Sequence, residues 1–190
     1  MTNRGIELHY KIKEDLKRRF NPLPNATLMG IKNYGQSRLD GWNNMLILGD
    51  NLIVLKTLLE DSEIARQVKL VYIDPPFATN QDFRCGDSRT ISRSRQDKIA
   101  YQDRIVGIEY LEFLRQRLYL LRDILADDGS IYVHIDWKVG HYVKVLMDEI
   151  FGAKRFINNI TRVKCNPKSF KRKAYGNMTD PFYPSYPTGG

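Results

Sequence analysis

VKLVYIDPPF, residues 68–77, joins a strand-like apolar run to a turn that its prolines impose. The run is rich in β-branched residues, which is typical of a strand buried in a sheet. Proline has no amide hydrogen to donate to a neighbouring strand, so Pro75 and Pro76 end the strand. The stretch therefore predicts a buried strand followed by a rigid turn that carries a carboxylate and an aromatic ring.

Further apolar runs predict strands before and after this one. Residues 45–48 read Met-Leu-Ile-Leu, and residues 130–135 read Ser-Ile-Tyr-Val-His-Ile. His134 lies inside the second run, where the pattern predicts a histidine of the core. Residues 157–163 predict one more strand.

Apolar residues spaced by three or four positions predict three helices. One begins at Asn51 as its cap and has leucines at 52, 55 and 59 on one face. The strongest pattern repeats leucine at 111, 114, 118, 121 and 125. Asp-Asp-Gly at 127–129 is expected to end this helix. Residues 143–150 hold the face of the third helix, which Gly152 closes. A short basic helix is predicted within residues 6–20.

The order of these elements predicts the fold class. Strands that alternate with helices indicate an α/β protein, with a parallel sheet that carries helices on both faces. Residues 78–107 are polar and without a clean period, so they predict a long loop. We expect an amino-terminal extension or strap over residues 1–41, the α/β domain over 42–160, and a basic segment with an irregular tail over 161–190.

Each of the three main predicted strands runs into an aspartate: Asp50, Asp74 and Asp136. In open sheets of this class, ligands bind at the carboxyl edge, where these side chains would gather. An aspartate after a strand also caps the next helix, and this interpretation is slightly favoured for Asp50 and Asp136.

Composition narrows the class of protein and of partner. The chain has 190 residues, enough for one domain, and it has no apolar run that approaches the roughly 20 residues of a membrane span. Its two cysteines show neither disulfide nor zinc spacing, so we expect no metal site and a reducing cytoplasm. The net charge of +8 favours a polyanionic partner, nucleic acid before an anionic membrane.

The positive charge is concentrated in two runs, Arg84–Lys98 and Arg162–Lys173. Such runs are as often solvated loops as binding surfaces. We expect their basic residues to contact DNA: Arg84, Arg89, Arg93, Arg95, Lys98, Lys164, Lys168, Lys171, Arg172 and Lys173.

The turn at residues 74–77 is suited to hold a planar base. A carboxylate accepts a hydrogen bond from an exocyclic amine, proline fixes the backbone so that carbonyls point outward, and an aromatic ring stacks on a base at about 1–3 kcal/mol. The alternative is a strand that simply ends in a rigid turn.

Several linked motifs resemble one known family, the site-specific DNA methyltransferases that act on exocyclic amino groups, over about residues 42–175. Within it, the chain is similar to adenine-N6 enzymes of the permuted, or β, order, such as type III modification subunits. The motifs are LGDNL (48–52), YIDPPF (72–77), LRDIL (121–125), DGSIYVHID (128–136) and VLMDEIFG (145–152).

This resemblance implies a Rossmann-like, S-adenosylmethionine-dependent methyltransferase fold and an adenine flipped out of double-stranded DNA. Asp74 and the carbonyl of Pro75 would hold the amino group, Pro76 would stiffen the turn, and Phe77 would stack on the base. Asp50 and Asp74 would contact the cofactor. The acid at position 74 favours adenine; many cytosine-N4 enzymes of the family carry serine there, and cytosine-N4 specificity stays open.

The sequence has no Gly-x-Gly, although the family's cofactor loop needs such glycines for close approach of the backbone. We therefore expect the amino-terminal part of a methyltransferase, with an incomplete cofactor pocket and no measurable turnover alone. Its expected partners are a restriction subunit or the missing carboxyl-terminal half.

Three other interpretations stay open. Protein and RNA amino-methyltransferases use a related turn, but their glycine-rich loop precedes it and residues 1–73 contain none. A non-catalytic DNA-binding or assembly fragment, completed by a partner, would bind phosphate without cofactor and with steep salt dependence. An inert remnant would leave sheet edges uncovered.

Overall fold

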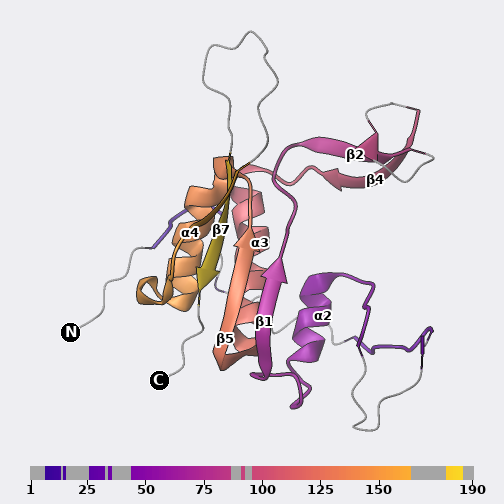
Figure 1. The fold of residues 1–190 in the computed structure, drawn as a ribbon, viewed down its shortest axis with the longest axis vertical. Coiled ribbons are helices and arrows are strands. Elements are labelled where there is room, and N and C mark those ends of the chain that lie inside the picture. Colours follow the sequence, from indigo (N-terminus) through magenta and orange to yellow (C-terminus); the bar gives the residue numbers. More distant parts are fainter. Residues whose placement is uncertain are drawn as a thin grey trace.

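The main sheet has four strands in the order β1-β5-β7-β6 (Figure 1). The computed structural model describes residues 7–13, 15, 26–32, 34–35, 44–86, 91–92, 96–163 and 179–185. Its strands are β1 (Val68–Ile73), β5 (Leu125–His134), β7 (Thr179–Ser185) and β6 (Ile160–Val163). β1 and β5 are parallel, whereas β7 runs antiparallel to both of its neighbours. The α/β class is thus confirmed, but the sheet is mixed and the prediction of a parallel sheet was wrong.

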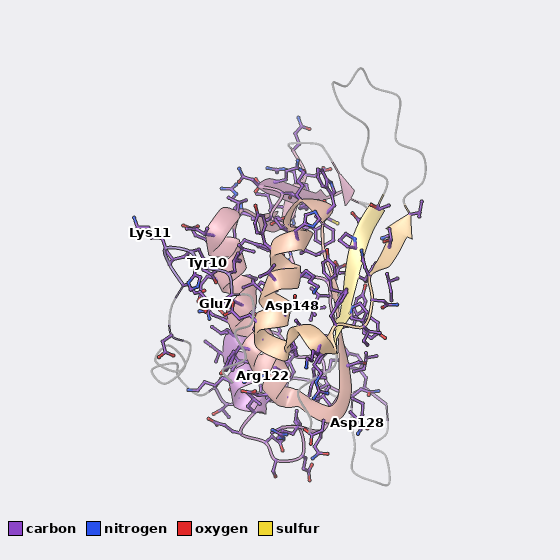
Figure 2. The ribbon with its side chains drawn as sticks, turned by 90° about the vertical axis from the view of Figure 1, so that its left-hand side faces the viewer. Glu7, Tyr10, Lys11, Arg122, Asp128 and Asp148 are labelled. Carbon is purple, nitrogen blue, oxygen red and sulfur yellow. The ribbon has the colours of Figure 1, made fainter. Side chains whose placement is uncertain are left out.

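The three predicted main helices are present: α2 (Asn51–Leu58), α3 (Gly107–Ile124) and α4 (Trp137–Phe151). A short 3₁₀ turn follows at Ala153–Arg155. α2 packs against α3 and α3 against α4, so these helices form one layer beside the sheet (Figure 2). None of the described helices has the length and apolar character needed to cross a membrane.

The core lies between this helical layer and one face of the sheet. Leu114 and Leu118 of α3 and Leu146 of α4 are at most 1% exposed, and they pack with Ile131 and Val133 of β5. Full burial of such a side chain contributes about 1.5–3 kcal/mol, so the leucine spacing read from the sequence is what attaches the helices to the sheet.

The other face of the sheet has no helix over it among the elements described. Leu70 and Tyr72 of β1 point to that side and are 60% and 57% exposed. The prediction of helices on both faces is therefore not met in the described part of the chain.

The predicted strand at residues 45–48 is wrong. This segment has no regular structure, and Leu46 and Leu48 are 100% and 96% exposed. A strand needs a neighbour for its amides and carbonyls as well as an apolar sequence, and these residues do not pair with β1, which is the edge strand of the described sheet on that side. The helix that follows is capped by Asp50, whose carboxylate accepts a hydrogen bond from the amide of Leu52 (2.8 Å), and not by Asn51.

The predicted loop at 78–107 is also wrong, because it contains a three-stranded antiparallel sheet in the order β3-β2-β4. Its strands are β2 (Gln81–Cys85), β3 (Ile91–Ser92) and β4 (Lys98–Asp103). The hairpin of β2 and β4 projects beyond the carboxyl end of β1 (Figure 1). Local antiparallel pairing forms it, and none of its described apolar side chains is fully buried, so its sequence shows no period that could predict strands.

The tail expected to be irregular contains β7, which pairs with β5 on one side and with β6 on the other. Three prolines, two glycines and the lack of a period in residues 177–190 led to the prediction of a tail, and two of these prolines, Pro181 and Pro184, lie in β7. Their carbonyls still accept hydrogen bonds, from the amides of Ile135 (3.2 Å) and Ile157 (3.4 Å). A proline lacks only the donor, so a strand can contain it wherever the partner needs an acceptor.

Residues 7–13 contain no helix and lie along α3 and α4 (Figure 2), whereas residues 6, 14 and 16–20 of the predicted basic helix lie outside the described residues. The Tyr10 hydroxyl donates to Glu112 Oε2 (2.7 Å), and Lys13 Nζ lies 2.8 Å from Glu149 Oε1. An apolar cavity of about 320 Å³ remains between this segment and the two helices, lined by Leu8, His9, Tyr10, Gly107, Ile108, Leu111, Val139 and Tyr142.

Candidate functional site

The parallel pairing of β1 with β5 places Asp74 beside His134. Ile73 is in register with Val133, so the next residue of each strand meets at the same carboxyl edge. His134 Nδ1 lies 3.0 Å from Asp74 Oδ1, within hydrogen-bond distance. The Asp74 side chain is 56% exposed and the His134 side chain 7% exposed. At this edge of the sheet, the Asp74 carboxylate is exposed to solvent and contacts the buried imidazole of His134.

Aromatic rings from three segments meet behind this pair. The His134 ring stacks on Phe182 of β7, with centroids 4.1 Å apart and planes 4° apart. Phe77 meets the same imidazole edge-on at 5.2 Å and 85°. His134 and Phe182 are partners in the antiparallel register, so β7 supplies a residue that sequence analysis did not place at the site.

A buried carboxylate fixes the turn that follows β1. Asp103 Oδ2, at the end of β4, accepts hydrogen bonds from the Phe77 amide (3.1 Å), the Thr79 amide (2.9 Å) and the Thr79 hydroxyl (2.8 Å). Ala78 and Asn80 both have a φ of 55°, in the left-handed region that costs a residue with a side chain about 1–3 kcal/mol. The bonds from Asp103 thus stabilise a strained turn and fix where Phe77 lies.

Asp103 is a site residue that could not be recognised from the sequence, because nothing marks a lone aspartate in a polar segment as buried. In the structure Asp103 is 1% exposed. The one signal that the sequence offers is its place just before the helix of repeated leucines.

Polar atoms without partners lie around the turn. Asp103 Oδ1, the Tyr110 hydroxyl and His134 Nε2 are buried and have no hydrogen-bond partner within the described ranges. Burial first, and then the carboxylates of Asp103, Asp136 and Asp74, raise the pKa of Tyr110, so its hydroxyl keeps its proton. Buried polar atoms are normally satisfied by protein, water or ligand, so this cluster marks the turn as a place for polar contacts.

Two of the three strand-end aspartates cap helices, as the sequence favoured. Asp136 accepts a hydrogen bond from the amide of Lys138 (2.9 Å) at the start of α4, and Asp50 caps α2. Asp50 Oδ1 also lies 3.6 Å from Arg117 Nη2. A contact of Asp50 with a cofactor stays a prediction.

Two of the ten basic residues predicted to bind DNA are described. Arg84 of β2 donates from Nη1 to the carbonyl of Asp97 (2.7 Å) and is 24% exposed, so it braces the hairpin. Lys98 of β4 is exposed. The other eight lie outside the described residues: Arg89, Arg93, Arg95, Lys164, Lys168, Lys171, Arg172 and Lys173.

Comparison with known proteins identifies the family. Residues 68–188 match the family N6_N4_Mtase, described as DNA methylase. The chain is 42% identical over 137 residues to the type II methyltransferase M.EcaI of Enterobacter cloacae, covering 72% of this chain and 28% of that protein. It is 36% identical over 118 residues to the probable type III restriction-modification enzyme HindVI Mod subunit of Haemophilus influenzae, covering 62% and 14%.

A third similar protein is the type III restriction-modification enzyme EcoP15I Mod subunit of Escherichia coli, 31% identical over 155 residues, covering 73% of this chain and 24% of that protein. The chain spans less than a third of the length of each of these relatives. The match includes the turn at Asp74, the strand with His134 and the strand with Phe182. The chain belongs to the N6_N4 family of DNA methylases.

Proposed function

We propose that this chain carries the target-base site of a DNA adenine-N6 methyltransferase of a restriction-modification system. The observation that carries the proposal is the turn at residues 74–77, where an exposed carboxylate stands on rigid backbone beside an aromatic ring. Family membership supports methyl transfer to an exocyclic amine, and the geometry supports the base-binding role of this edge.

The proposed chemistry needs the protein to align two reactants and to relieve charge. The Asp74 carboxylate accepts a hydrogen bond from the amino group of a flipped adenine, the Pro75 carbonyl accepts a second one, and Phe77 stacks on the ring. As the amino nitrogen gains a methyl group it becomes positive. Asp74 stabilises that charge and receives the proton that the nitrogen loses.

The proposed methyl donor is S-adenosylmethionine, which supplies an electrophilic methyl group on a sulfonium when it is bound. Carboxylates such as Asp50 and Asp74 fit its hydroxyl and ammonium groups as acceptors. The sequence has no Gly-x-Gly for the methionine end, so we propose that the isolated chain has no measurable turnover.

We further propose two partners. One is double-stranded DNA, whose phosphates would be bound by basic residues of the β2–β4 hairpin, on which Lys98 is exposed. The other is a restriction subunit or a second polypeptide that supplies the rest of the cofactor pocket. The exposed apolar side chains of Leu70 and Tyr72 support a covering partner on that face.

A chimera tests the proposal. The segment of this chain that aligns with the Enterobacter cloacae relative replaces its counterpart there, and DNA exposed to the chimera is hydrolysed and analysed for methylated bases. We expect N6-methyladenine, and its loss in Asp74→Ala. The matched control is Asp127→Ala, at the opposite end of the sheet and 66% exposed, which we expect to retain activity.

The products separate the alternatives. N4-methylcytosine instead of N6-methyladenine would establish the cytosine specificity, and full activity in Asp74→Ala would reject the site. For the chain alone, transfer of labelled methyl groups from S-adenosylmethionine to duplex DNA would refute the proposed lack of turnover.

A further inference from the structure

We propose that His134 is a positioning residue, which holds the Asp74 carboxylate in the orientation that accepts the amino group of the target base. The inference rests on the function proposed above and assigns a role to a residue that the sequence placed in the core. The 3.0 Å contact between His134 Nδ1 and Asp74 Oδ1 carries it.

Asp74 needs such a restraint. Its side chain is 56% exposed, and within the described ranges His134 is its one hydrogen-bonding or charged partner. An exposed carboxylate on two rotatable bonds samples several rotamers, and the selection of one of them costs side-chain entropy. The contact with His134 Nδ1 restrains one carboxylate oxygen before a base arrives and leaves the other free to accept.

The imidazole itself is fixed by packing from three segments. It belongs to β5, stacks on Phe182 of β7 at 4.1 Å and receives the edge of Phe77 at 5.2 Å. Its residue is only 5% exposed. The orientation of Nδ1 is therefore fixed. The His134 ring contacts both the Asp74 carboxylate and the Phe77 ring of the turn.

The state of the imidazole follows from its other nitrogen. Nε2 is buried without a hydrogen-bond partner among the described residues. A proton there would be a buried donor left unsatisfied, whereas a bare nitrogen leaves only a weakly demanding lone pair. A proton on Nδ1 would lie toward Asp74 Oδ1, 3.0 Å away, and would leave no unsatisfied donor at Nε2, so this tautomer is the one that the positioning role requires.

The first test reads this proton directly in the 190-residue chain. Long-range ¹H–¹⁵N correlation at pH 8 distinguishes the two neutral tautomers of a histidine. We expect His134 with its proton on Nδ1, and a change in its signals in Asp74→Ala. A proton on Nε2 would overturn the proposal, because Nδ1 could then not donate, and this reading needs neither DNA nor catalysis.

The second test measures what the restraint does for base binding. Adenosine and purine riboside, which lacks the amino group, are titrated into the 190-residue chain and followed by NMR. We expect adenosine to bind about tenfold more tightly, the value of a hydrogen bond to a charged group. Asp74→Ala should abolish this preference.

Two variants of His134 then separate its proton from its bulk. His134→Phe keeps a ring against Phe182 but has no donor, so the preference for adenosine should fall by about two- to fivefold, the cost of ordering a free side chain. His134→Asn keeps a donor near Nδ1 and should retain most of the preference. His141→Phe, at an exposed position of α4, is the matched control and should equal the wild type.

The outcomes are distinct. A wild-type preference in His134→Phe, with its loss in Asp74→Ala, would overturn the positioning role and leave the proposed function standing. Equal losses in His134→Phe and His134→Asn would also overturn it, because packing and not donation would then be the cause. No preference in the wild type and no effect of Asp74→Ala would instead reject the base site, and the tautomer measurement would still decide the His134–Asp74 bond.

Discussion

Replacement of Asp103 by alanine should loosen the turn that carries the proposed base site. Three donors would lose their acceptor: the amides of Phe77 and Thr79 and the Thr79 hydroxyl, at 2.8–3.1 Å. Hydrogen bonds to a charged group contribute about 1.5–3 kcal/mol each. Alanine also removes the cost of burying the Asp103 carboxylate, which offsets several kcal/mol of the lost hydrogen-bond energy. We therefore expect the free energy of unfolding to fall by about 2–3 kcal/mol.

Urea unfolding of the 190-residue chain measures this loss, and amide hydrogen exchange at Phe77 and Thr79 shows whether the turn opens locally. Asp103→Asn keeps one acceptor oxygen and should lose less than Asp103→Ala. Thr79→Val removes the hydroxyl bond alone and should cost about 1 kcal/mol. A loss of less than about 0.5 kcal/mol in Asp103→Ala, the range of an ordinary surface substitution, would refute the reasoning.

Three further predictions concern backbone and electrostatics away from the base contact. Gly129→Ala should lower the melting temperature, because a Cβ there would lie 2.7 Å from the carbonyl of Val68; a normal melting temperature would contradict this close approach. Ala78→Gly should not destabilise, because glycine adopts the φ of 55° without strain; a clear loss in urea unfolding would be contrary. Glu112→Gln should flatten the acid limb of stability against pH. Burial raises the pKa of Glu112, but the hydrogen bonds to its carboxylate, led by that from Arg115, have the larger effect and hold this pKa below 4.5. The ionised Glu112 therefore stabilises the folded state above pH 4.5, and this contribution is lost as the pH falls through the folded-state pKa. If the free energy of unfolding of Glu112→Gln fell with decreasing pH as steeply as that of the wild type, this prediction would be rejected.

The parts of the fold that the sequence predicted are those whose burial leaves a period in it. α3 and α4 were predicted because one face of each meets the sheet, as the burial of Leu118 and Leu146 shows. β1 and β5 were predicted because their apolar runs end in acids or prolines that stop a strand. Gly152, with a φ of 95°, ends α4 as predicted.

The parts that the sequence did not predict depend on pairing with distant backbone. β7 meets β5 through residues more than 45 positions away, and its prolines are tolerated only because their carbonyls accept. The segment 45–48 has the composition of a strand but does not pair with β1, the edge strand of the described sheet. The hairpin of β2 and β4 forms by local pairing. None of its described apolar side chains is fully buried, so its sequence has no apolar period from which strands could be predicted.

The candidate site shows the same division. Asp74 and Phe77 could be predicted because the prolines between them fix a turn that local sequence encodes. His134 was correctly placed in a buried strand, but its contact with Asp74 follows from the register between two strands. Asp103 and Phe182 reach the site through tertiary pairing, which no local pattern reports.

The central claim is that the turn at residues 74–77 receives an adenine, and intermolecular nuclear Overhauser effects test it most directly. In a complex of adenosine with the 190-residue chain, we predict effects between the H2 and H8 protons of adenine and the ring protons of Phe77, and their loss in Asp74→Ala. Effects that reach instead Leu8, Tyr10 and Ile108, at the cavity between the amino-terminal segment and the helices, would contradict the claim.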